Sequence, residues 1–107
     1  MSVRRERGKG FNEVVYGDAL EKEFIDHIIN YSSETSYNIH YKGNLLPHKY
    51  KADFIIYNKI ILEIKAIRCL TDSHIKQTLN YLAVSKLKLG LLINFGEDSL
   101  THKRVIL

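Results

Sequence analysis

Cysteine and proline are scarce in this sequence, and long apolar runs are absent. Cys69 is the only cysteine, which excludes an internal disulfide and fits a reducing compartment. Pro47 is the only proline, and no repeat, low-complexity tract or linker interrupts the chain. The apolar runs are far shorter than the ~18 residues of a membrane span, and the charged N-terminal segment is unlike a signal peptide. We therefore expect one domain over residues 1–107, soluble and cytoplasmic, with no membrane contact.

The chain is long enough to bury a core without staples. It has 107 residues, of which 45% are hydrophobic, whereas domains that depend on disulfides or metals usually have fewer than about 40 residues. Sixteen Lys and Arg against twelve Asp and Glu give a formal charge of +4. This excess is compatible with a phosphate-rich partner such as nucleic acid, but net charge alone is not specific.

Hydrophobic periodicity predicts one helix before a series of strands. Residues 12–30 have Asn12 as a plausible cap and a stripe of apolar residues with helical spacing: Tyr16, Leu20, Phe24 and Ile28. Short strands are predicted at residues 37–41, 51–57 and 60–67, with a turn at residues 42–44. The last two of these strands are separated by Asn58 and Lys59 and are expected to form a hairpin.

The second half of the chain predicts another helix and two more strands. Thr71 can cap a helix over residues 72–88, and Gly90 is a suitable stop. Residues 91–95 then predict a buried strand and residues 105–107 a short strand at a sheet edge. The expected fold class is α/β, with a mixed central β-sheet flanked by two helices.

Two charged residues interrupt the apolar strand at residues 60–67. Glu63 and Lys65 are two positions apart, so their side chains share one face. Burying a carboxylate and an ammonium is costly unless they are paired or bind a ligand, which favours a functional site. A solvated sheet face is the alternative that this strand alone leaves open.

Asp53 strengthens the functional interpretation, provided that the hairpin has the right register. Two carboxylates beside a lysine suit Mg²⁺, which takes one or two carboxylates together with waters and substrate phosphate. A two-residue loop at Asn58 and Lys59 would turn Asp53 away from Glu63. A three-residue loop that includes Tyr57 would set Asp53 opposite Glu63, so the site requires such a loop or a bulge.

The motifs resemble a known family. Residues 10–16 form a G-x-x-E-x-x-Y string, followed in order by Lys-Ala-Asp at residues 51–53 and Leu-Glu-Ile-Lys-Ala at residues 62–66. Together they look like the GxxExxY proteins of the PD-(D/E)XK nuclease superfamily, whose core is restriction-endonuclease-like. The resemblance extends from about residue 8 to residue 95. It implies that Asp53, Glu63 and Lys65 form the catalytic triplet.

The resemblance also implies contributions from both helices. Glu13 corresponds to an extra acidic residue of the first helix, which implies a metal site formed by Glu13, Asp53 and Glu63. From the residues alone, a carboxylate on a core-facing stripe is costly unless it serves a polar site, although the helix dipole also favours Glu at a helix start. Gln77 and Tyr81 share a helix face and resemble the Q-x-x-x-Y motif of the superfamily's recombination exonucleases.

The Q-x-x-x-Y resemblance implies that Gln77 supports the active-site groups or a phosphate and that Tyr81 positions DNA or packs beside the lysine. Tyr81 as an ordinary core aromatic remains an alternative. His74, one turn earlier on the same face, is the weakest candidate for a site residue.

Three hypotheses follow for the function. The first is a nuclease that uses Mg²⁺ or Mn²⁺ to hydrolyse nucleic acid, with DNA as the expected substrate. The second is a catalytically silent domain of the same fold that binds nucleic acid or a protein partner. The third is a structural subunit, for which polar residues on the Glu63 face should be exposed and scattered. The sequence leaves a homodimer open.

Overall fold

A computed structural model describes residues 13–107, which form five strands and two helices. The elements in chain order are α2 (Glu13–Asp26), β1 (Tyr31–Tyr41), β2 (Asn44–Ile56), β3 (Ile60–Lys65), α3 (Asp72–Ser85), β4 (Leu89–Asn94) and β5 (Thr101–Ile106). The strands lie side by side in chain order, with β3 and β4 parallel and the other neighbours antiparallel. The predicted α/β class, the mixed sheet, the two helices and the edge position of the last strand are confirmed.

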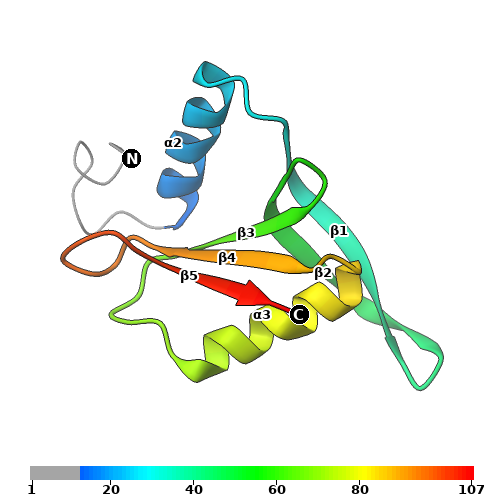
Figure 1. Ribbon diagram of the computed structural model, residues 1–107. Coiled ribbons are helices and arrows are strands. Elements are labelled where there is room, and N and C mark those ends of the chain that lie inside the picture. Colours follow the sequence, from blue (N-terminus) through cyan, green and yellow to red (C-terminus); the bar gives the residue numbers. More distant parts are fainter. Residues whose placement is uncertain (1–12) are drawn as a thin grey trace.

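The two helices cover opposite faces of the sheet (Figure 1). On the α2 face, Tyr16, Leu20 and Phe24 pack with residues of β2, β3 and β4, and the Tyr16 ring stacks on Phe95 at 4.2 Å. On the α3 face, Leu82 belongs to a second core cluster that also includes residues of β2, β3, β4 and β5. Both faces of the central strands are therefore buried, which explains the nearly continuous apolar sequence of β3.

Helix α2 ends earlier than predicted. Ile28, predicted on the buried stripe, is 92% exposed and has a left-handed backbone with φ of 56°. The N–H of Ile28 bonds the carbonyl of Ile25, and the N–H of Ile29 bonds the carbonyl of Phe24. This pattern is a Schellman cap, in which glycine is the usual left-handed residue. The cap turns the chain toward β1, so the helical period stops applying after Asp26.

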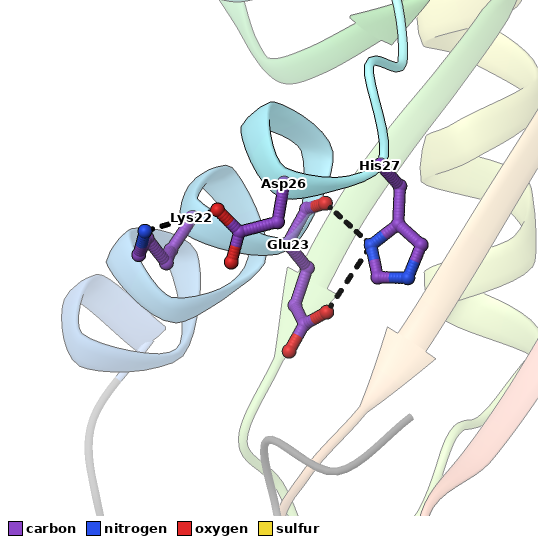
Figure 2. Close-up of polar contacts among 4 residues, drawn as sticks. All are labelled: Lys22, Glu23, Asp26 and His27. Atoms are coloured by element: carbon purple, nitrogen blue, oxygen red, sulfur yellow. Dashed lines mark hydrogen bonds and ion pairs between the residues drawn. The ribbon is translucent and has the colours of Figure 1, made fainter.

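The exposed side of α2 carries pairs of charged residues one helical turn apart. The Nζ atom of Lys22 lies 3.0 Å from Oδ1 of Asp26, and Nδ1 of His27 lies 3.5 Å from Oε2 of Glu23 (Figure 2). His27 also lies 2.9 Å from the backbone oxygen of Glu23. Exposed pairs of this kind contribute only about 0.3–0.5 kcal/mol each. They mark the solvent side of the helix rather than a functional site.

The first hairpin is longer than the sequence predicts. Strand β1 begins at Tyr31 instead of residue 37, and β2 runs without interruption through Pro47. The register shifts between the pairs Asn38–Lys49 and His40–Leu45, which accommodates the missing N–H of proline. Lys42 and Gly43 both have positive φ and connect the strands, as in a two-residue hairpin turn.

The hairpin between β2 and β3 has the predicted three-residue loop. Ile56 pairs with Ile60 and Phe54 with Leu62, so Tyr57, Asn58 and Lys59 form the connection. Continuing the same register by one residue sets Asp53 opposite Glu63. The hairpin therefore has the odd-numbered loop that a site shared by Asp53 and Glu63 requires.

Helix α3 begins at the predicted residue but ends before the predicted stop. Thr71 and His74 cap its start, because the N–H of Thr71 donates to Nδ1 of His74 at 3.0 Å. The helix ends at Ser85, where Lys86 adopts the left-handed conformation. Gly90 is no helix stop: it lies inside β4, where an added Cβ would lie 2.8 Å from Cγ2 of Thr78. Its small size permits close packing of β4 against α3.

Candidate active site

Asp53 lies where β2 and β3 separate. Their backbone pairing ends at Phe54 and Leu62, and Oδ2 of Asp53 accepts the N–H of Ile64 at 2.8 Å. If β2 and β3 stayed paired, the N–H of Ile64 would bond a backbone oxygen of β2. The side chain of Asp53 takes the place of that backbone oxygen.

A local irregularity on the other side of β2 accompanies this separation. Glu34 has φ of 53° and falls opposite Asp53, between the pairs Ser33–Phe54 and Thr35–Ala52. The alternation of side chains also breaks here, because Ala52 and Ile55 both join the core on the α3 face. A regular strand would direct residues three apart to opposite faces.

Glu63 is almost completely buried, with only 6% of its surface exposed. Its Oε1 atom accepts a hydrogen bond from the hydroxyl of Tyr50. Burial raises the pKa of Glu63 to about 8, and the charge of Asp53 and a hydrogen bond to it act in the same direction. The Tyr50 hydroxyl and the Lys65 ammonium oppose this effect by lowering the pKa. Glu63 is therefore buried in contact with Asp53 and Tyr50, whereas a structural subunit was expected to have exposed and scattered polar residues on this face.

Asp53 and Glu63 together have the donor chemistry for a divalent cation. The raised pKa of Glu63 and its hydrogen bond to Asp53 describe a carboxyl group that holds its proton beside a second carboxyl group. A cation could replace that proton, and a further hydrogen bond through one oxygen orients each carboxylate. Over residues 13–107, no three Asp, Glu, His or Cys side chains are close enough to form a complete metal cage. Two carboxylates suffice for Mg²⁺, which takes its remaining ligands from water and substrate.

Lys65 is two residues beyond Glu63 at the end of β3. Its side chain is partly buried, and its charge acts on the carboxylate of Glu63. The carbonyl of Lys65 accepts the N–H of Phe95 at 2.8 Å, which ties this end of β3 to β4. The ammonium is therefore placed on a fixed strand beside the carboxylate pair.

Glu13 lies at the start of α2 and lines the same cleft as Asp53. The cleft has a volume of about 380 Å³ and lies between α2, β1 and β2. It is acidic, because its lining includes the side chains of Glu13, Asp18, Glu21, Glu34 and Asp53. Glu13 itself is exposed, so the argument that it occupies a costly core position is wrong. Its predicted cap, Asn12, and the glycine at the head of its motif lie outside the described residues.

Gln77 and Tyr81 share one face of α3, as predicted. Tyr81 is partly buried and stacks on the ring of Tyr50 with centroids 3.7 Å apart, while Gln77 is exposed. Burial and the charge of Glu63 raise the pKa of Tyr81, whereas a hydrogen bond to Gln77 lowers it. His74, in contrast, is occupied by the cap at Thr71.

Sequence reasoning missed two residues that organise this site. One is Tyr50, whose lysine-flanked position in β2 gave no sign of its contact with Glu63. The other is Asn94, a fully buried side chain that bonds both the N–H and the carbonyl of Ile67, two residues beyond Lys65. A buried asparagine in an apolar strand is unusual enough to have been a signal.

Comparison with known proteins identifies the superfamily of this chain. A family model described as the PD-(D/E)XK nuclease superfamily matches residues 1–105. The chain belongs to that superfamily. Members of this superfamily are generally nucleases and typically use divalent metals. No curated protein matches this sequence.

A solved structure supports the superfamily fold. The crystal structure of SSO0001 is similar to this chain with a TM-score of 0.69 and 25% sequence identity. The match covers 88% of this chain and 50% of the other, so this chain spans about half the length of that one. In residues 13–107, no helix is long and apolar enough to cross a membrane.

Proposed function

We propose that this chain is a nuclease that requires Mg²⁺ or Mn²⁺ and hydrolyses phosphodiester bonds of nucleic acid, with DNA as the substrate. The observation that carries the proposal is the pair of adjacent carboxylates, Asp53 and Glu63, beside Lys65 on a buried strand. Such a pair is electrostatically unfavourable without a proton or a cation, and cation binding gives a functional reason for the buried position of Glu63 beside Asp53. The order of the sequence motifs further supports assignment to the GxxExxY group and to one functional unit over residues 1–107.

Each residue has a distinct role in this proposal. Asp53 and Glu63 hold the metal directly, and Glu13 holds it through water from the exposed start of α2. The metal lowers the pKa of water and stabilises negative charge on the phosphate. Lys65 contributes a further positive charge to the phosphate and orients the attacking water.

The residues of α3 complete the proposed site. Tyr81 stacks on Tyr50 and is not among the proposed metal ligands; its role is to position the nucleic acid or to pack beside the site. Gln77 supports Tyr81 through their hydrogen bond and is exposed enough to contact a phosphate.

A comparison of Lys65→Ala with wild type tests the proposal. We expect wild type to cleave linear, circular or single-stranded DNA in Mg²⁺ or Mn²⁺ and to lose activity in EDTA, and Lys65→Ala to be at least about 100-fold slower. Lys59→Ala is a matched control, because Lys59 is an exposed lysine in the loop of the same hairpin. An RNA substrate in the same assay identifies the preferred nucleic acid.

Two results would contradict the proposal. Equal cleavage by wild type and Lys65→Ala would remove the catalytic assignment of Lys65. Binding of DNA without any metal-dependent cleavage would instead favour the catalytically silent binding domain.

A further inference from the structure

The hydroxyl of Tyr50 is directed at the carboxylate of Glu63 in the protein core. It donates a hydrogen bond to Oε1, and both side chains are at least 94% buried. We propose that Tyr50 is a positioning residue that orients Glu63 for cation binding, an inference that rests on the function proposed above. Tyr50 itself is not proposed to contact the metal or the nucleic acid.

Tyr50 is held in place by aromatic rings from two other elements. Tyr81 of α3 stacks on it with centroids 3.7 Å apart and an interplanar angle of 11°. Tyr37 of β1 stacks at 5.9 Å and 17°. The ring of Tyr50 is fixed by packing in the core, so its hydroxyl has little freedom to leave Glu63.

Holding one oxygen of a carboxylate determines which oxygen faces a cation. Oε1 of Glu63 is bound to Tyr50, and Oδ2 of Asp53 is bound to the N–H of Ile64. Each carboxylate therefore has one oxygen fixed by a group other than its carboxylate neighbour, which restricts how the pair can turn toward a metal. Hydrogen bonds of this kind to metal ligands commonly change metal affinity or activity 10- to 100-fold.

The alternative is that Tyr50 is only a core aromatic. That role depends on the ring, whereas positioning of Glu63 depends on the hydroxyl. Tyr50→Phe retains the ring and removes the hydroxyl, so it separates the two roles. Its stacking partners, Tyr37 and Tyr81, remain unchanged in this variant.

The test measures Mn²⁺ binding to the full chain by isothermal titration calorimetry, with far-UV circular dichroism as a check on folding. We expect Tyr50→Phe to bind Mn²⁺ about 10- to 100-fold more weakly than wild type. Cleavage by the variant should need correspondingly more Mn²⁺ and should recover at saturating Mn²⁺. A purely structural defect would not be corrected in this way.

Tyr31→Phe is a matched control. The hydroxyl of Tyr31 donates to Oε2 of Glu21 at 3.0 Å, so this substitution also removes a tyrosine–carboxylate hydrogen bond. Neither of these residues contacts Glu63 in the hydrogen bonds described, and we expect Mn²⁺ affinity to stay within about twofold of wild type.

The outcomes separate this inference from the proposed function. Weaker Mn²⁺ binding by Tyr50→Phe supports the inference even if wild type cleaves no substrate, in which case only the proposed function fails. Unchanged Mn²⁺ affinity and unchanged metal dependence of cleavage overturn the inference while the nuclease function stands. No Mn²⁺ binding by wild type overturns both. An equal loss of affinity in Tyr31→Phe also overturns the inference, because the effect would not be specific to Glu63.

Discussion

Glu63 is a residue whose burial opposes the stability of the protein without metal. Its carboxyl group has a pKa of about 8 in the folded chain, against 4.5 for an ordinary Glu. Between these pH values the folded state binds a proton that the unfolded state has released. The folded state is therefore favoured most below pH about 4.5, and this contribution is lost as the pH rises through about 8.

We expect Glu63→Gln to remove this pH dependence. Glutamine is nearly isosteric with protonated Glu and stays neutral, so the metal-free variant should be more stable than wild type at pH 9, by on the order of a few kcal/mol. The same variant should lose metal binding and cleavage. Urea unfolding of both proteins at pH 5 and pH 9, in EDTA, measures the effect. A wild-type unfolding free energy that does not fall with pH would show that the Glu63 assignment is wrong.

At the scale of elements, the contact between α3 and β4 depends on the absence of a side chain at Gly90. A Cβ at this position would lie 2.8 Å from Cγ2 of Thr78, whose side chain is buried against the sheet. The hydroxyl of Thr78 donates to the carbonyl of His74 at 2.9 Å, which fixes the orientation of its methyl group. Strand and helix therefore approach more closely than an alanine would permit.

Gly90→Ala should destabilise the protein by about 1–3 kcal/mol, the usual cost of overpacking a core. Thr78→Ser removes the Cγ2 methyl group that would clash with the added Cβ, and it keeps the hydroxyl. It should therefore restore part of the lost unfolding free energy. Unfolding free energies of the two single variants and the double variant form a thermodynamic cycle. Strictly additive effects would mean that Gly90 and Thr78 are not in conflict.

For the whole molecule, metal binding and folding stability are linked. A ligand that binds only the folded state stabilises it, by about 2.7 kcal/mol when its free concentration is 100 times Kd. In this protein the gain should depend on pH, because the cation would replace the proton that Glu63 retains through its raised pKa.

We therefore expect Mn²⁺ to raise the melting temperature, and to raise it more at pH 8 than at pH 6. Differential scanning calorimetry with and without the metal provides the measurement, and EDTA should reverse the shift. Asp53→Asn is expected to abolish the shift, whereas Lys59→Ala should retain it. A shift of the same size at both pH values would rule out proton displacement.

The local order of the elements could be predicted from periodicity, since apolar spacing reports which residues face a core. The sequence also predicted the strand that carries Glu63 and Lys65, and it required an odd loop or a bulge for Asp53 to meet them. Two predictions were wrong because a local sequence pattern does not determine where the chain turns or how closely two elements pack. Ile28 continues the helical stripe, but the chain must turn there toward β1. Gly90 is a residue type that commonly ends helices, but here it permits close packing of β4 against α3.

The sequence by itself determined which residues carry charge and which strands they occupy, because side-chain alternation is a local property of the backbone. Only the tertiary structure decided how Asp53 reaches Glu63, since this depends on where β2 separates from β3 and on the irregularity opposite Glu34. It also decided that Tyr50 holds Glu63 and that Tyr81 covers Tyr50. These contacts join separate elements, and no local pattern in the sequence encodes them.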